Sequence, residues 1–245
     1  YGMAVVTAVV AQNTQAVRVV SPLAPELVQA QLEAVFEDVA VAAVKIGMVA
    51  NAGIAEAIAE VLARHRPPFV VFDPVMAAST HKRLMNESDL ERIRTVLLPQ
   101  VSLLTPNLKE AARLLGIAQP VDEAGMRACL PALQALGVPN VLLKGGHLAD
   151  DAPDAPESTD LLATPEGVIR LSAPRIATRH GHGTGCTLSS AIAALWPQHG
   201  LEKATRMAKD YVHGALLHAD ALQVGHGRGP LHHFWQAVHL PGQLA

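Results

Sequence analysis

Short apolar runs alternate with longer segments of helical spacing along most of the chain. In residues 25–38, apolar side chains recur at the three- and four-residue intervals of one helix face. The short runs are rich in Val, Leu and Ile, which favours buried strands. The predicted strands are residues 3–10, 43–48, 69–72, 101–104, 141–144, 159–163 and 168–172. The predicted helices are residues 25–38, 51–64, 87–98, 108–115, 122–136, 187–195 and 201–222.

This alternation predicts an α/β fold with a central, mostly parallel sheet and helices on both faces. The last two predicted strands flank a Pro-Glu-Gly turn and are expected to form a hairpin. Residues 150–158 are rich in Asp, Pro and Ala without periodicity, which indicates a surface loop and not a domain boundary. We therefore expect a single domain over residues 1–245. Ligands of such sheets bind beyond the carboxyl ends of the strands, so functional residues are expected there.

Composition narrows the functional classes. Half of the 245 residues are hydrophobic and 17% are charged, which suits a protein with a sizeable core. The net charge of −3 and the absence of a basic patch argue against nucleic-acid binding. No uncharged apolar tract is long enough to predict a membrane span. Two cysteines are too few for a disulfide framework, so we expect a reduced, cytoplasmic protein.

The sequence Gly183-Thr184-Gly185-Cys186 stands directly before a predicted helix. Glycines at a helix entry allow a sharp turn and expose backbone N–H groups, which bind anions together with the positive helix end. The expected anion is a phosphate group passing between donor and acceptor. A plain helix entry, with threonine as the cap and glycine for the turn, is the alternative.

Cys186 is placed where its thiol would face this anion site. A helix N-terminus lowers the pKa of a thiol, and the thiolate could accept the proton of an attacking hydroxyl group. The alternative is a small buried packing residue, a common role of cysteine. Cys129 lies on an ordinary helical pattern and is predicted to belong to the core.

Asn107 and Glu110 are three positions apart at the start of a predicted helix, so both project from its first turn. An amide and a carboxylate in this arrangement can orient the hydration shell of Mg²⁺ bound to phosphates. The alternative is a capping box, with Asn107 as the N-cap and Glu110 at the third helical position.

Three further predicted strands end in polar residues. Lys144 precedes Gly145-Gly146, where the backbone could lie close to a nucleotide and the ammonium could neutralise phosphate. Asp73 could meet a metal or substrate, and Gln12 offers a donor and an acceptor for the edge of a pyrimidine. The alternatives are a glycine turn with a solvated lysine, an Asp-Pro turn, and a polar strand end.

Taken together, these motifs resemble the hydroxymethylpyrimidine/phosphomethylpyrimidine kinases of thiamin synthesis, within the ribokinase-like superfamily. The resemblance extends over nearly the whole chain. Its motifs, in order, are Ala11-Gln12-Asn13-Thr14, Lys45-Ile46-Gly47-Met48, Asp73-Pro74-Val75-Met76, Leu104-Thr105-Pro106-Asn107-Leu108-Lys109-Glu110, Lys144-Gly145-Gly146-His147, Gly183-Thr184-Gly185-Cys186-Thr187 and Val224-Gly225-His226-Gly227.

The resemblance implies a ribokinase-like fold and ATP-dependent phosphorylation of the hydroxymethylpyrimidine, followed by phosphorylation of its monophosphate. ATP and Mg²⁺ would be the cofactors, and a homodimer the assembly. The implied roles are Cys186 as catalytic base, Gly183, Thr184 and Gly185 as the anion hole, Gln12 for the pyrimidine, Lys144, Asn107 and Glu110 for the nucleotide, and Asp73 with Glu110 for the metal.

Two departures from the family pattern matter. The family begins with a strand and a Gly-rich, Asp-containing loop ahead of the position of Tyr1, so we expect its first strand to be missing from this chain. A lysine usual in the family is replaced by Ser79, and Lys82 or Arg83 could substitute for its charge.

The rival hypotheses are a pyridoxal-type kinase and a non-catalytic pyrimidine-binding regulator on the same fold.

Overall fold

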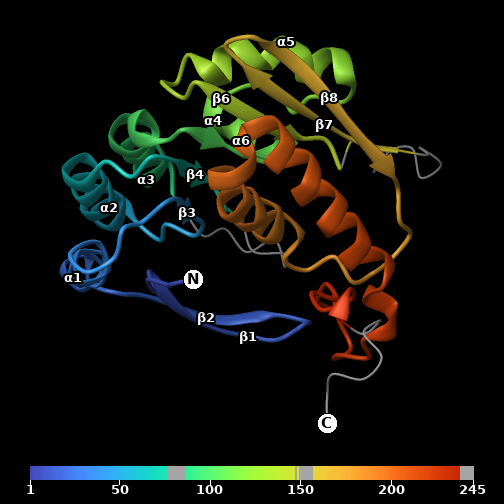
Figure 1. The fold of residues 1–245 in the computed structure, drawn as a ribbon, viewed down its shortest axis with the longest axis horizontal. Coiled ribbons are helices and arrows are strands. Elements are labelled where there is room, and N and C mark those ends of the chain that lie inside the picture. Colours follow the sequence, from blue (N-terminus) through green and yellow to red (C-terminus); the bar gives the residue numbers. More distant parts are fainter. Residues whose placement is uncertain (77–85, 147, 149–156, 238–245) are drawn as a thin grey trace.

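The computed structural model describes residues 1–76, 86–146, 148 and 157–237. Its centre is a sheet of six strands in the order β3-β4-β5-β6-β7-β8 (Figure 1). The first four strands are parallel to one another, and β7 is antiparallel to both of its neighbours. The strands are β3 (Val44–Ile46), β4 (Val70–Phe72), β5 (Leu103–Leu104), β6 (Asn140–Lys144), β7 (Glu157–Thr164) and β8 (Gly167–Pro174).

Helices cover both faces of this sheet because each central strand is apolar on both sides. Phe72 and Leu104 belong to the core on the face covered by α1 to α5, whereas Val71 and Leu103 pack against α6. Figure 1 shows α6 on the opposite face of the sheet from these five helices. The helices are α1 (Pro25–Phe36), α2 (Ala52–His65), α3 (Glu87–Arg92), α4 (Leu108–Leu115), α5 (Glu123–Gln134) and α6 (Thr184–Leu217). The predicted α/β class, mostly parallel sheet and two helical layers are confirmed.

The N-terminal strand differs from its prediction. Residues 3–10 were expected to form a buried strand, but the strand is β1 (Ala8–Gln12), which pairs with an unpredicted β2 (Val17–Pro22) in a separate two-stranded sheet. Val9 and Val19 are 59% and 57% exposed. A run of valines favours the extended backbone, but it does not determine whether a second layer covers the strand.

Three predicted helices also have different ends. Residues 87–98 are not one α-helix: α3 stops at Arg92 and continues as a π-helical turn (Ile93–Leu97) and a 3₁₀ turn (Leu98–Gln100). The two predicted closing helices follow each other directly in α6, broken by the non-helical backbone of Gly200 (φ 71°, ψ 175°). The spacing of apolar residues does not reveal such local breaks, because a break of one turn or one residue hardly changes which side chains face the core.

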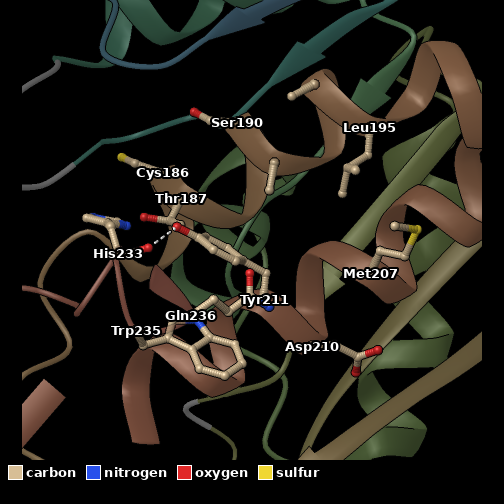
Figure 2. A pocket seen from close by; sticks show the side chains of 12 residues that line it. Cys186, Thr187, Ser190, Leu195, Met207, Asp210, Tyr211, His233, Trp235 and Gln236 are labelled. Atoms are coloured by element: carbon tan, nitrogen blue, oxygen red, sulfur yellow. Dashed lines mark hydrogen bonds between the residues drawn. The ribbon is translucent and has the colours of Figure 1, made fainter. Parts of the chain in front are cut away.

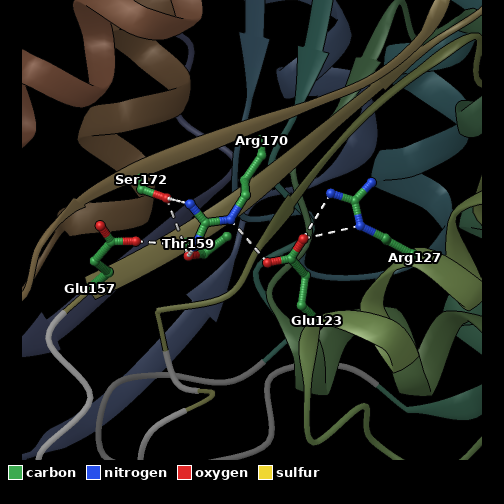
Figure 3. A network of polar contacts seen from close by, with 6 residues as sticks. All are labelled: Glu123, Arg127, Glu157, Thr159, Arg170 and Ser172. Atoms are coloured by element: carbon green, nitrogen blue, oxygen red, sulfur yellow. Dashed lines mark hydrogen bonds and ion pairs between the residues drawn. The ribbon is translucent and has the colours of Figure 1, made fainter.

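The predicted hairpin is confirmed as β7 and β8, and an arginine attaches it to α5 (Figure 3). Arg170 donates to the carboxylates of Glu123 and Glu157, each at 3.0 Å, and to Thr159 Oγ1 at 3.0 Å. Arg127, one turn after Glu123 in α5, donates to the same carboxylate. These two arginines lower the pKa of Glu123 by hydrogen bonding.

Within the described residues, no helix combines the length and the apolar character needed to cross a membrane. Cys129 is buried in α5, as predicted, and its thiol donates to the Met126 carbonyl at 3.2 Å. Residues 150–156 of the predicted loop at 150–158 lie outside the described residues, and residues 157 and 158 belong to β7 instead of a loop. His147 and the altered stretch from Ser79 to Arg83 also lie outside the described residues.

Candidate active site

The carboxyl ends of β4 and β6 place Asp73 and Lys144 in contact. Lys144 Nζ lies 2.7 Å from Asp73 Oδ1, and both side chains are largely buried. The hydroxyls of Thr105 and Ser189 donate to the same carboxylate, at 3.4 and 3.5 Å. Lys144 is therefore neither a solvated turn residue nor free to neutralise phosphate alone, because its charge is already shared with Asp73.

The carboxylates around Lys144 counteract the effect of burial on its pKa. Desolvation would lower the pKa of Lys144, but the carboxylates of Asp73 and Glu110 outweigh it and raise that pKa. Desolvation raises the pKa of Glu110 from 4.5 to about 7, against the lowering effect of Lys144 and of hydrogen bonds from Asn107. The site therefore holds a permanent cation beside a carboxyl group that titrates near neutral pH.

Asn107 and Glu110 form the capping box that the sequence allowed as the alternative to a ligand-binding pair. Asn107 Oδ1 accepts from the Glu110 N–H at 2.9 Å, and Glu110 Oε2 accepts from the Asn107 N–H at 2.7 Å. Both residues nevertheless line the same cleft as Lys144. Capping fixes their orientation, and it leaves acceptor capacity on the Glu110 carboxylate for a ligand.

The glycine loop begins α6 at Gly183, whose left-handed backbone (φ 88°) makes it the N-cap. It offers no side-chain cap, and the Thr184 hydroxyl donates instead to the Gly181 carbonyl at 2.8 Å. A helix leaves the N–H groups of its first turn without partners inside the helix. A Cβ on Gly185 would lie only 3.1 Å from Lys144 Nζ, so the helix entry packs directly on the ion pair.

Cys186 is exposed, so the alternative interpretation, a buried packing residue, does not hold. Its pKa also differs from the prediction: desolvation by the surrounding protein raises the pKa of the thiol, and Lys45 opposes this rise. The prediction considered the helix end alone, whereas the nearby carboxylates of Asp73 and Glu110 also favour the neutral thiol.

One cleft, with a volume of about 690 Å³, brings the sequence-predicted residues together. They come from the end of β1, from the carboxyl ends of the parallel strands and from the start of α6. The predicted residues that line the cleft are Gln12, Asp73, Asn107, Glu110, Lys144, Gly183, Thr184, Gly185 and Cys186. Gly145 does not line it; a Cβ there would meet the Thr159 carbonyl at 2.2 Å, so this glycine serves strand packing.

Sequence reasoning missed a second ion pair in the cleft. Lys209 Nζ, in the second half of α6, lies 2.6 Å from Asp160 Oδ2 in β7. Asp160 Oδ1 also accepts from the Gly145 N–H at 3.0 Å. An aspartate within an otherwise apolar strand was a possible signal, but nothing in the sequence pointed to Lys209 as its partner.

Residues 227 and 228 of the C-terminal segment (residues 218–237) contact the turn between β1 and β2 beside the cleft. The Gly227 N–H donates to Thr14 Oγ1 at 3.1 Å, and the Arg228 N–H donates to the Thr14 carbonyl at 3.0 Å. A Cβ on Gly227 would lie 2.1 Å from the same carbonyl, so only glycine fits. The two motifs around Thr14 and Gly227, distant in sequence, therefore form one contact that positions the neighbouring Gln12.

A second cavity of about 890 Å³ is lined by Cys186, by both halves of α6 and by side chains from the segment 233–236 (Figure 2). Its wall combines apolar side chains such as Leu195 and Met207 with the rings of Tyr211 and Trp235. The Tyr211 hydroxyl donates to the His233 carbonyl at 2.9 Å and so ties the C-terminal segment to α6. Cys186 is accessible from both cavities.

Comparison with known proteins decides the family. Residues 1–232 match the model of a family described as phosphomethylpyrimidine kinase. The chain belongs to this family. It is 49% identical over 235 residues to the hydroxymethylpyrimidine/phosphomethylpyrimidine kinase of Salmonella typhimurium, covering 96% of this chain and 86% of the relative. The corresponding kinase of Escherichia coli is 48% identical with the same coverage. The predicted family and enzyme class are confirmed.

Solved structures agree with this assignment. The phosphomethylpyrimidine kinase of Clostridium difficile has a TM-score of 0.74 and 35% identity, covering 88% of this chain and 86% of that one. An ADP complex of Bacillus subtilis pyridoxal kinase has a TM-score of 0.86 and 27% identity, covering 98% and 88%. The predicted ribokinase-like fold is therefore confirmed, and identity favours the pyrimidine kinases over the pyridoxal kinases.

Proposed function

We propose that this chain transfers the γ-phosphoryl group of ATP to 4-amino-5-hydroxymethyl-2-methylpyrimidine and then phosphorylates the monophosphate. The names of its relatives support this substrate, and the nucleotide complexes of related kinases support ATP. The observation that carries the proposal is the packing of the Gly185 helix entry on the Asp73–Lys144 pair, with Cys186 at the same cleft. The helix entry that we propose as the anion site thus lies beside a cation and an ionisable group.

In this reaction the acceptor oxygen forms a bond to the γ-phosphorus while the bond from that phosphorus to the β-phosphate oxygen breaks, and ADP leaves. The developing charge lies on the phosphoryl oxygens, so preorganised N–H groups and cations stabilise the transition state. The N–H groups at the start of α6 and the Lys144 ammonium would serve this purpose. Positioning and charge neutralisation, with little covalent chemistry, account for the rate.

Cys186 would accept the proton of the attacking hydroxyl group. Because the pKa of the thiol is raised, the ligand-free site holds mainly the neutral form, and base catalysis requires its thiolate. Lys45 opposes this rise. Turnover should therefore increase with pH over the range in which the thiol ionises.

Asp73 and Glu110 fit Mg²⁺ through water molecules better than as direct ligands. Asp73 already accepts from Lys144, and Glu110 accepts from the Asn107 backbone. The described residues contain no cluster of three His, Cys, Asp or Glu side chains that could hold a metal. This suits an ion that keeps several waters and binds mainly to substrate phosphates, where it would neutralise their charge.

Gln12 would pair with the pyrimidine edge, since it lines the cleft and the Thr14–Gly227 contact fixes the turn that follows it.

Pyridoxal is the second candidate acceptor, favoured by the TM-score of 0.86 to the Bacillus subtilis pyridoxal kinase. Parallel assays of ATP-dependent phosphorylation of the two acceptors would decide between them. A higher kcat/KM for pyridoxal would overturn the proposed substrate, and no turnover of either would favour a binding protein.

We further propose that residues 1–245 act as one kinase unit and that the enzyme is a cytoplasmic homodimer. The metabolic role of the kinase relatives supports the location. Light scattering on the purified protein would test the assembly, for which a mass of twice 25.8 kDa is expected.

A further inference from the structure

The cations that line the cleft are not equivalent. Lys144 is paired with Asp73 at 2.7 Å and Lys209 with Asp160 at 2.6 Å. Two arginines, Arg175 and Arg228, line the same cleft, and neither has a carboxylate within ion-pair distance in the described part of the chain. Arg175 Nη1 donates to the Gly146 carbonyl at 3.0 Å, whereas the guanidinium of Arg228 makes no such hydrogen bond within the described residues. Its positive charge is thus available to a ligand, whereas each of the two lysines already shares its charge with a carboxylate.

Backbone contacts hold Arg228 on two sides. Its own N–H donates to the Thr14 carbonyl at 3.0 Å, and the carbonyl of the following Gly229 accepts from the His182 N–H at 3.0 Å. The guanidinium lies over Gly181, where a Cβ would be 2.8 Å from Nη2 and 3.4 Å from Nε. Arg228 therefore stands between the turn after Gln12 and the segment that leads into the glycine loop.

The two proposed acceptors differ in charge. The hydroxymethyl compound carries a neutral alcohol, whereas its monophosphate carries between one and two negative charges at pH 7. That extra charge enters a cleft that already contains the carboxyl groups of Asp73, Glu110 and Asp160. A second acceptor of this kind needs a cation that the first one does not. A guanidinium binds phosphate oxygens through two parallel hydrogen bonds, which gives both charge and orientation.

We propose that Arg228 binds the phosphate of the monophosphate acceptor and thereby determines specificity for the second phosphoryl transfer. This inference rests on the proposed function and concerns the same cleft. It separates the residues that serve both transfers, such as Lys144, from one that serves mainly the second.

The test compares kcat/KM for the two acceptors at saturating ATP in wild type, R228M, R228K and G181A, with R18M as the control. Arg18 is an exposed arginine on β2 that does not line the cleft. We expect R228M to lower kcat/KM for the monophosphate about 10-fold to 100-fold, as for a lost charge-assisted hydrogen bond. The value for the alcohol should change less than about 3-fold. R228K should keep part of the monophosphate activity, because it keeps the charge but not the planar fork.

G181A tests the position without removing charge. Its methyl group would occupy the space of the guanidinium tip, which is flexible, so folding is preserved while Arg228 is displaced. We expect a loss for the monophosphate in the same direction as in R228M, and R18M should match wild type. Equal losses for both acceptors, with a raised KM for ATP, would assign Arg228 to the donor and overturn the inference. So would unchanged kinetics in R228M.

Calorimetric binding of 4-amino-2-methyl-5-phosphomethylpyrimidine in the absence of ATP separates this inference from the proposed function. Weaker binding to R228M than to wild type supports the role of Arg228 even if the wild type shows no turnover, which would defeat the proposed function alone. Equal affinity of the two proteins, or absence of binding to both, overturns the inference.

Discussion

Lys144 Nζ lies 2.7 Å from Asp73 Oδ1, although the strands that carry these residues, β6 and β4, are separated by β5. The pair therefore bridges the carboxyl ends of three strands. Asp73 is only 2% exposed, and the entry of α6 packs on the pair through Gly185. One ion pair thus connects the carboxyl ends of the central strands with the start of α6.

Removing one partner of this pair should be costly. K144M leaves the buried Asp73 carboxylate without its cation, and we expect a loss of about 3 to 5 kcal/mol in the free energy of unfolding. Urea denaturation followed by circular dichroism would measure it. The double variant D73N/K144M should lose less than K144M, since no uncompensated charge stays buried.

The exposed pair of Arg206 and Glu202 in α6 provides the control. R206A should change the free energy of unfolding by no more than about 0.5 kcal/mol. A loss in K144M as small as that in R206A would contradict a structural role for the buried pair.

Glu110 should make stability depend on pH. Its pKa rises from 4.5 to about 7 on folding, so between these values the folded state binds more protons than the unfolded state. Stability therefore falls as pH rises through this window, by up to about 3 kcal/mol. Urea denaturation at pH 5 and pH 8 should show a smaller difference in E110Q than in wild type. An equal pH difference in the two proteins would refute this, and E202Q controls for removal of a surface charge.

Cys186 should be the reactive thiol. It is exposed at the cleft, whereas Cys129 is buried, so iodoacetamide should modify about one thiol per chain under native conditions. The rate of modification should rise from pH 7 to pH 9, because the raised pKa keeps the thiol neutral at lower pH. Mass spectrometry of the labelled peptide would identify the residue. Preferential labelling of Cys129 would contradict the exposure of the two residues.

The same thiol should govern turnover. C186A should lower kcat about 100-fold to 10,000-fold if Cys186 is the base, and kcat/KM of the wild type should increase with pH as the thiolate forms. Steady-state kinetics across pH would show both effects. Retention of wild-type kcat in C186A would remove Cys186 from the proposed mechanism.

Gly183 should tolerate asparagine better than alanine. Its φ of 88° lies in the left-handed region, but a Cβ there would meet no atom within 4 Å. Backbone strain alone should therefore cost about 1 kcal/mol of stability in G183A, and less in G183N. Thermal unfolding of both variants would test this order, and equal stabilities would contradict it.

Much of the site could be predicted because its residues directly follow apolar strands or precede a helix. Asp73 follows β4, Lys144 ends β6, and Gly183 to Cys186 are the N-cap and first turn of α6. The parallel strands bring their carboxyl ends to one edge, where these residues line the cleft. The pairing of Lys209 with Asp160 could not be predicted, since the partners lie 49 residues apart on different layers. The separate sheet of β1 and β2 could not be predicted either, because a run of valines favours extended backbone without determining which sheet the strand joins.

The contact between Thr14 and Gly227 joins residues 213 positions apart. During synthesis on a ribosome, the turn beside Gln12 cannot make this contact until Gly227 has emerged. The sheet and its flanking helices can assemble earlier, because their contacts need only the preceding chain. The cleft is therefore completed late, and a nascent chain in which Gly227 has not yet emerged would have an incomplete cleft.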